Sequence, residues 1–114
     1  MRFVTTIAAL ALSATAALAD PVGSYSVDGR NPDGSSYKGS VSVSRTGETF
    51  KVVWAIGSEK YVGTAVGDDD FFAVGYRSGN QSGIAVYSRD GKGWKGIWTY
   101  QGGTSIGLET LTPK

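Results

Sequence analysis

The chain has 114 residues, which suffices for one domain and leaves no room for a second module. Its 11 Lys and Arg residues are scattered singly against 10 Asp and Glu residues, and this pattern argues against nucleic acid, which selects clustered basic residues. The sequence contains neither Cys nor His. It therefore has no disulfide, no Ser-His or Cys-His nucleophile pair, and none of the common zinc, copper or haem ligand sets.

Residues 1–19 have the features of a secretory signal peptide. A basic residue precedes an apolar run over Phe3–Leu12, and small residues follow up to Ala17-Leu18-Ala19. The apolar run is shorter than the roughly 20 residues of a membrane-spanning helix. We therefore expect cleavage before Asp20, a periplasmic or secreted protein with no membrane insertion, and a single β-barrel domain over residues 20–114.

Clusters of turn-forming residues divide the rest of the chain into short stretches rich in Val, Ile, Tyr, Phe and Trp, about eleven residues apart. The clusters are Asn31-Pro32-Asp33-Gly34-Ser35, Thr46-Gly47-Glu48, Gly57-Ser58, Gly67-Asp68-Asp69-Asp70, Ser78-Gly79-Asn80-Gln81, Asp90-Gly91-Lys92-Gly93 and Gln101-Gly102-Gly103. This spacing predicts an all-β fold, a roughly eight-stranded antiparallel up-and-down meander that closes into a barrel. A two-sheet sandwich is the alternative, although it normally needs some longer connections.

The first predicted hairpin has one apolar and one polar face. Tyr37, Gly39, Val41 and Val43 alternate with Lys38, Ser40, Ser42 and Ser44, and after the turn Phe50, Val52, Trp54 and Ile56 alternate with Lys51, Val53 and Ala55. The face that carries the large apolar groups should point inward.

The stretch from Phe71 to Tyr76 carries large apolar groups on both faces. A loop, the N-terminal segment or a dimer partner could cover the outer face, or that face could be a recognition surface. We place Phe72, Val74 and Tyr76 on the outer face, with Tyr87 as a neighbour. This face is the candidate surface for a protein partner.

The last predicted strands again alternate. Trp94, Gly96, Trp98 and Tyr100 form one face, and Ile106 and Leu108 form another, which leaves Glu109 pointing outward. Several glycines lie two positions from an aromatic residue, a pattern typical of curved sheets in which a ring covers the gap above a glycine. Alternatively, Trp54, Tyr61, Trp94 and Trp98 line a cup inside the barrel for a flat or apolar ligand.

The carboxylates give little support for catalysis. All but Glu109 fall in or beside predicted turns, and a lone outward acid on a strand is typical of a solubilising residue. The Asp68-Asp69-Asp70 and Asn31–Ser35 turns offer oxygen ligands but lack the spacing of a calcium loop. We therefore predict no enzyme activity, no cofactor and no metal.

Six segments carry a resemblance to a known group. They are Gly23-Ser24-Tyr25-Ser26-Val27, Asn31–Gly39, Val52–Gly57, Tyr61-Val62-Gly63-Thr64, Ala73-Val74-Gly75-Tyr76 and Trp94-Lys95-Gly96-Ile97-Trp98. Over nearly the whole mature domain the chain resembles small exported bacterial proteins often labelled fibronectin-binding, and this resemblance implies adhesion to host matrix. The meander also resembles barrels of the avidin and lipocalin type, in which an early Gly-x-Trp packs at the closed end; here Gly23-Ser24-Tyr25 would take that place.

The leading interpretation is an exported, non-enzymatic β-barrel that binds an extracellular protein such as fibronectin, as a monomer or a homodimer. The second is an avidin-like or lipocalin-like carrier of a small ligand inside the barrel. A small envelope inhibitor or stress protein is a third interpretation, and a hydrolase that uses turn carboxylates comes last.

Overall fold

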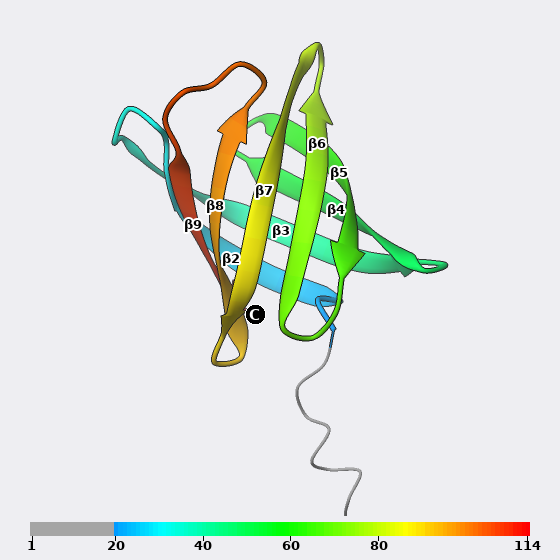
Figure 1. Ribbon diagram of the computed structural model, residues 1–114. Coiled ribbons are helices and arrows are strands. Elements are labelled where there is room, and N and C mark those ends of the chain that lie inside the picture. The colour runs from blue at the N-terminus through cyan, green and yellow to red at the C-terminus, as the bar shows by residue number, and fades with distance from the viewer. Residues whose placement is uncertain (1–19) are drawn as a thin grey trace, which may run out of the picture.

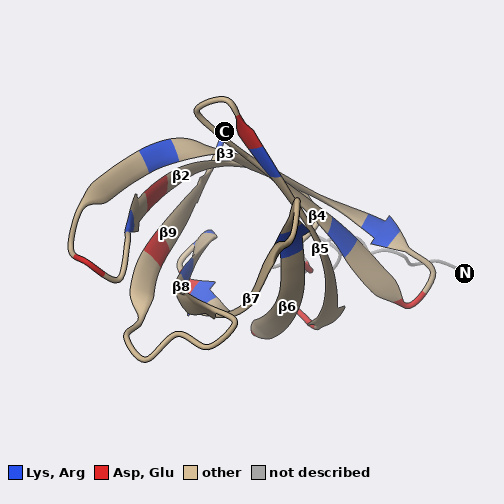
Figure 2. Cartoon of the chain, turned by 90° about the horizontal axis from the view of Figure 1, so that it is seen from above, with Lys and Arg blue, Asp and Glu red and all other residues tan. Residues whose placement is uncertain are grey.

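The computed structural model describes residues 20–114, so the predicted signal peptide lies outside the described residues (Figure 1). Eight strands follow one another: β2 (Gly23–Arg30), β3 (Ser36–Thr46), β4 (Thr49–Ile56), β5 (Glu59–Gly67), β6 (Phe71–Ser78), β7 (Gln81–Asp90), β8 (Gly93–Tyr100) and β9 (Gly107–Pro113). Each strand pairs antiparallel with the next, and β9 pairs with β2 to close the barrel (Figure 2). The predicted eight-stranded up-and-down barrel is confirmed. Within residues 20–114, no helix has the length and apolar character needed to cross a membrane.

Four of the connections are two-residue turns that begin with glycine. Gly47, Gly57, Gly79 and Gly91 have φ angles of 61° or 62°. This left-handed conformation is what the first central residue of a tight hairpin turn requires, and glycine adopts it without steric strain. The turns therefore keep consecutive strands adjacent, which is the geometric basis of the meander.

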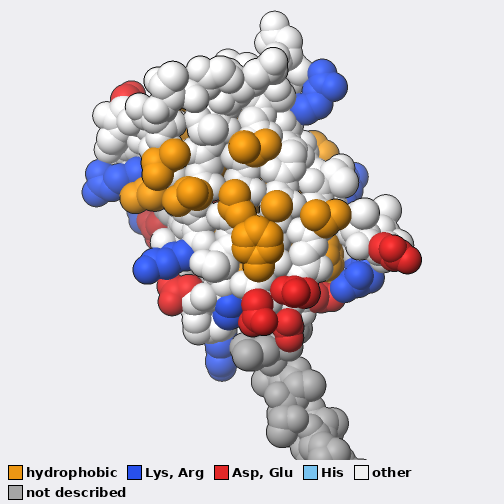
Figure 3. Space-filling view, in the orientation of Figure 1, with side chains coloured by type: hydrophobic (Ala, Val, Ile, Leu, Met, Phe, Trp, Pro, Cys, Tyr) orange, Lys and Arg blue, Asp and Glu red, His pale blue; other side chains and the backbone are white. Residues whose placement is uncertain are grey.

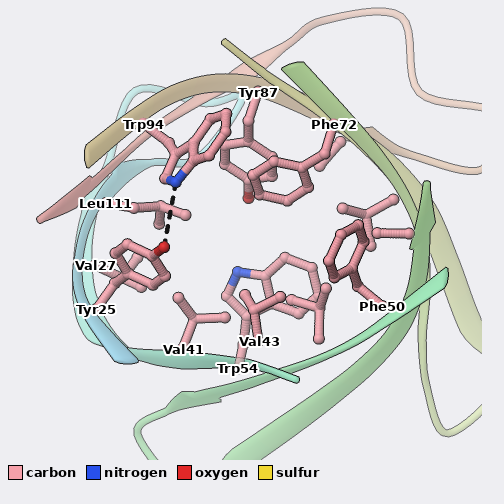
Figure 4. Packing of buried hydrophobic residues seen from close by; sticks show 14 residues of the cluster. Tyr25, Val27, Val41, Val43, Phe50, Trp54, Phe72, Tyr87, Trp94 and Leu111 are labelled. Atoms are coloured by element: carbon pink, nitrogen blue, oxygen red, sulfur yellow. Dashed lines mark hydrogen bonds between the residues drawn. The ribbon is translucent and has the colours of Figure 1, made fainter. Parts of the chain in front are cut away.

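Side chains fill one half of the barrel, at the end that carries the β3–β4, β5–β6 and β7–β8 turns. Figure 4 shows this packing, in which Phe72 stacks on Tyr87 with ring centroids 4.7 Å apart and meets Trp94 edge-on at 4.8 Å. The Trp94 indole donates a hydrogen bond to the Tyr25 hydroxyl (3.3 Å), which in turn donates to the Pro21 carbonyl (2.7 Å). The guanidinium of Arg89 lies over the Trp94 ring, 4.0 Å from its centroid. We call this half the closed end.

The inward faces predicted for the first hairpin are confirmed. Val41 and Val43 are buried, and the register places them directly opposite Trp54 and Val52. Phe50 is buried on the same face of β4. Because the alternate residues of this hairpin are mostly Ser and Lys, only one face could be the inner one.

The outward assignment of the β6 residues is wrong. Phe72, Val74 and Tyr87 are 0%, 3% and 2% exposed and belong to the barrel interior, and Tyr76 is partly buried against the same core. Phe71 occupies the outer face instead. The register explains the phase, since Phe72 lies opposite Tyr87, where the two rings stack.

The predicted phase of the last strand is also wrong. Gly107, Glu109 and Leu111 point inward, whereas Ile106 and Leu108 are exposed. Leu111 lies opposite Trp94 in β8 and fills the closed end. A one-residue change of phase moves every side chain of a strand to the other face, so Glu109 enters the barrel together with Leu111.

An apolar row crosses the outer surface of five strands. Directly paired positions link its members, which are Val66, Ala73, Val86, Ile97 and Leu108. Figure 3 shows hydrophobic side chains gathered on this side of the molecule. The apolar outer face expected for β6 therefore exists, but residues other than those predicted form it.

Candidate functional site

The half of the barrel opposite the closed end holds a cavity of about 930 Å³. Seven aromatic residues line it: Tyr37, Trp54, Tyr61, Tyr76, Tyr87, Trp98 and Tyr100. Its mouth lies among the loops at the other end of the barrel, where Asn31, Asn80, Gln101 and Gly102 contribute to the lining. The interior is therefore plugged at one end and hollow at the other.

Three of the four rings predicted to line a cup do line this cavity: Trp54, Tyr61 and Trp98. Trp94 does not, because it is fully buried in the closed end. Tyr76 and Tyr87, which were assigned to an outer surface, lie in the cavity wall. The structure thus brings together residues of the predicted interior cup and residues of the predicted outer surface.

Four of the cavity rings lie over glycines of the neighbouring strand. The directly paired positions are Tyr37 with Gly29, Tyr76 with Gly83, Tyr87 with Gly96, and Trp98 with Gly107. A Cβ placed on any of these glycines would come within 2.1–2.4 Å of the ring or, for Tyr76, of its hydroxyl oxygen, much closer than atoms approach. Glycine therefore lets each ring lie against the wall, and the centre of the barrel stays open. Rings do cover glycines, but the expected pairing along one strand is wrong, because each covered glycine lies on the neighbouring strand.

Contacts between the rings stiffen this wall. Tyr76 meets Trp54 at a centroid distance of 5.7 Å and Tyr61 at 6.1 Å, both at steep interplanar angles. Tyr37 meets Trp98 in the same way at 6.1 Å. The Tyr76 hydroxyl donates a hydrogen bond to the Thr99 carbonyl, at 3.1 Å. This bond reaches over β7 and holds the β6 ring against β8.

Glu109 lies in the cavity lining, where it is only 7% exposed, and three side chains donate hydrogen bonds to it. The Tyr37 hydroxyl donates to Oε2 at 2.6 Å. The Tyr87 hydroxyl (2.5 Å) and the Trp54 indole (3.2 Å) donate to Oε1. The outward orientation expected for this acid is therefore wrong.

The register explains how the two phenols reach the carboxylate. Glu109 lies directly between Gly29 of β2 and Gly96 of β8. Tyr37 covers Gly29 and Tyr87 covers Gly96, so the two rings approach Glu109 from opposite sides across positions that lack side chains. A larger residue at either glycine would occupy the space through which a phenol reaches the acid.

The pKa values of Glu109 and the cavity tyrosines favour hydrogen bonding over proton transfer. Burial raises the pKa of Glu109, while the hydrogen bonds from Tyr37, Tyr87 and Trp54 act in the opposite direction. Burial and the nearby Glu109 charge raise the pKa of Tyr37 and of Tyr87. Burial, followed by the charge of neighbouring Tyr61, raises the pKa of Tyr76 to about 12. The phenols therefore stay protonated at neutral pH and serve as donors.

The two oxygen-rich turns use their acids to shape the backbone. Asp68 Oδ1 accepts the backbone N–H groups of Asp70 (2.9 Å) and Phe71 (3.1 Å). Asp33 Oδ1 accepts from the backbone N–H of Ser35 (2.9 Å) and from its hydroxyl (2.6 Å). These contacts explain the turn residues by local hydrogen bonding.

No family model and no curated protein matches the chain. Among solved structures, the chain is similar to a redesigned β-barrel, with a TM-score of 0.71 and 21% sequence identity over 82% of this chain and 91% of the designed one. At this identity the likeness shows the barrel fold alone. The resemblance to fibronectin-labelled proteins stays a prediction.

Proposed function

We propose that the protein is a non-enzymatic binding protein that holds a small organic molecule in the hollow half of its barrel. The observation that carries this proposal is the cavity of about 930 Å³ with its aromatic wall. Ligand pockets usually measure about 300–1,000 Å³ and combine a mostly apolar lining with a few placed polar groups. The rings and the hydrogen-bonded Glu109 match that description.

The walls favour binding because they are already in place. Rings that lie over glycines and contact one another need no rearrangement to meet a ligand, so little ordering entropy opposes binding. The closed end supplies a core that does not depend on the cavity being filled.

Tryptophan fluorescence tests this proposal directly. Trp54 and Trp98 line the cavity, whereas Trp94 does not. A compound from a small-molecule library that enters the barrel should quench or shift the emission of the wild type, and this response should disappear in a double Trp54→Phe, Trp98→Phe variant. A response that persists with Trp94 alone would place binding elsewhere.

A matched pair of filling variants locates the binding site. Ala85 lies in the cavity lining, and Ala73 occupies the outer face of the neighbouring strand. Ala85→Phe should block binding and Ala73→Phe should leave it intact, with circular dichroism confirming that both fold. Gln81→Trp, on the inward-facing side of β7 at the mouth, is a second blocking variant that leaves the core unchanged. Binding that tolerates both blocking changes would refute the proposal.

The N-terminal pattern supports a site of action outside the cytoplasm. Fractionation of cells that express the full chain, followed by N-terminal sequencing, should find a mature protein that starts at Asp20 in the periplasm or the medium. An uncleaved cytoplasmic chain would contradict this part of the proposal.

The apolar row supports a second candidate function, recognition of an extracellular matrix protein such as fibronectin. Val66, Ile97 and Leu108 are 57%, 47% and 49% exposed, and exposed apolar patches on sheets are typical of interaction sites. Surface plasmon resonance on immobilised fibronectin should show binding that Ile97→Ser and Leu108→Ser reduce and that the Ala85→Phe variant retains. Absence of binding, or binding insensitive to both serine changes, would exclude this candidate.

A further inference from the structure

We propose that the cavity selects an organic cation, that is, a flat aromatic molecule with a positively charged nitrogen; this inference rests on the proposed function. The charged residues of the lining are Glu59 and Glu109, and both are acidic. No Lys, Arg or His is among the lining residues. The cavity therefore presents negative charge with no basic group of its own to compensate it.

The buried acid in particular lacks a counter-charge. Its three hydrogen-bond donors, Tyr37, Tyr87 and Trp54, are all neutral side chains. The two salt bridges of residues 20–114, Lys38 with Asp28 and Arg45 with Asp20, lie elsewhere. Buried carboxylates are usually paired with a positive group, so a cationic ligand would supply what the fold leaves out.

The aromatic wall offers a second, independent reason. Trp54 and Tyr61 lie directly opposite each other on β4 and β5, and Tyr76 meets both at interplanar angles of 63° and 82°. Tyr76 thus stands at a steep angle to each of the other two rings, so this ring cluster presents ring faces in different directions, and the negative faces of aromatic rings attract ammonium groups.

The two acids lie on either side of this ring cluster. Glu59 is two residues from Tyr61 on the same face of β5, at the mouth. Glu109 accepts the Trp54 indole hydrogen bond in the interior. A flat cation that entered from the mouth would thus meet a carboxylate at the entrance, aromatic faces along the wall and a second carboxylate inside.

A dye pair of matched shape tests this inference. Thioflavin T is a flat cation, and its uncharged counterpart lacks only the methyl group on the thiazole nitrogen. We expect the wild type to bind thioflavin T at least about tenfold more tightly than the uncharged dye, in line with the strength of cation–π and charge pairing at a desolvated site. Quenching of Trp54 and Trp98 would report binding inside the barrel. Loss of dye binding in the Ala85→Phe variant would confirm the location.

Charge-neutralising variants of equal size separate the cavity from the surface. Glu59→Gln and Glu109→Gln should each reduce the preference for the cation, measured as the ratio of the two dissociation constants, severalfold. Glu48→Gln is the control, because Glu48 lies in the exposed β3–β4 turn at the closed end and its loss changes net charge equally. Glu59 is exposed at the mouth, so its variant tests the inference even if Glu109→Gln fails to fold.

Three outcomes are possible. A preference for the cation that depends on Glu59 or Glu109 but not on Glu48 would support the inference. Equal binding of both dyes inside the barrel would overturn it and leave the proposed small-molecule function standing. If neither dye, nor any library compound, enters the cavity, the proposed function and the inference both fail.

Discussion

The contact between Tyr37 and Gly29 gives a sharp test of how the cavity is built. In Gly29→Ala, the new Cβ would lie 2.1 Å from Tyr37 Cζ and 2.5 Å from its hydroxyl oxygen. The backbone at Gly29 is not among the glycines with positive φ, so alanine can adopt its conformation. The phenol must therefore lift from the wall and abandon its 2.6 Å hydrogen bond to Glu109.

The expected loss follows from two contributions. Overpacking a well-packed site typically costs about 1–3 kcal/mol, and a hydrogen bond to a charged group contributes about 1.5–3 kcal/mol. Alanine regains about 0.5–1 kcal/mol over glycine within a strand. We therefore expect Gly29→Ala to lower the free energy of unfolding by about 1.5–5.5 kcal/mol, measured by urea titration with tryptophan fluorescence.

Gly75 provides the matched control. It lies in the interior of β6, faces outward, and a Cβ there would meet nothing within 4 Å. Gly75→Ala should leave stability unchanged or raise it slightly. In a Tyr37→Ala background, Gly29→Ala should lose most of its effect, since no ring remains to be displaced. If Gly29→Ala proves no more destabilising than Gly75→Ala, the account of rings lying over glycines is wrong.

Three further predictions concern the acid, the core and the surface. Because the pKa of folded Glu109 is raised above its usual value of 4.5, the folded state binds more protons there than the unfolded state. The difference in stability between the wild type and Glu109→Gln should therefore change in one direction, with the wild type losing stability as pH rises from 4.5 through the folded pKa of Glu109 and no further change above it. Melting temperatures of both proteins from pH 3 to 8 measure this difference, and the opposite slope would contradict the prediction. Phe72→Ala should lower the free energy of unfolding in urea by about 3–5 kcal/mol, since Phe72 is fully buried against Tyr87 and Trp94, and a change below 1 kcal/mol would refute its place in the core. Ile97→Ser should shift the same measurement by no more than about 0.5 kcal/mol, because Ile97 contributes an exposed side chain to the apolar row, and a larger loss would mean that the row is covered.

The barrel could be predicted from the sequence because its turns and its first hairpin carry unambiguous signals. Glycines such as Gly47 and Gly57 mark two-residue turns, and such turns leave a strand no partner but its neighbour. On β3, the serines that alternate with Val41 and Val43 along the strand identify the outer face. Fold class and inward phase follow from these local features alone.

The phase of β6 could not be predicted because both faces of that strand are apolar. Phe71 and Phe72 are equivalent by type, and only the pairing with Tyr87 decides which one enters the core. The exposed apolar row removes the contrast on which alternation depends, and for this reason Phe72 and Val74 were assigned to the wrong side.

The cavity rings were easier to identify than the acid among them. Trp54 and Trp98 follow a clear alternation, but a strand glutamate ordinarily faces water. The feature that makes Glu109 an interior residue is its position between Gly29 and Gly96, which lie 80 and 13 residues away along the chain. That register exists only once β9 closes onto β2, and no local pattern encodes it.

The placement of Glu109 connects the stability of the barrel with the occupancy of its cavity. An ionised carboxylate held by neutral donors is less favourable than a paired one, so the empty protein retains an unfavourable electrostatic contribution that the closed-end core must offset. Any molecule that binds the folded state alone stabilises it by an amount that grows with the ratio of its concentration to its dissociation constant. A bound cation would in addition favour the ionised form of Glu109 and release a proton when the acid starts protonated. Stabilisation by such a ligand should therefore increase as pH rises through the pKa of Glu109, whereas stabilisation by an uncharged ligand of the same shape should not depend on this ionisation.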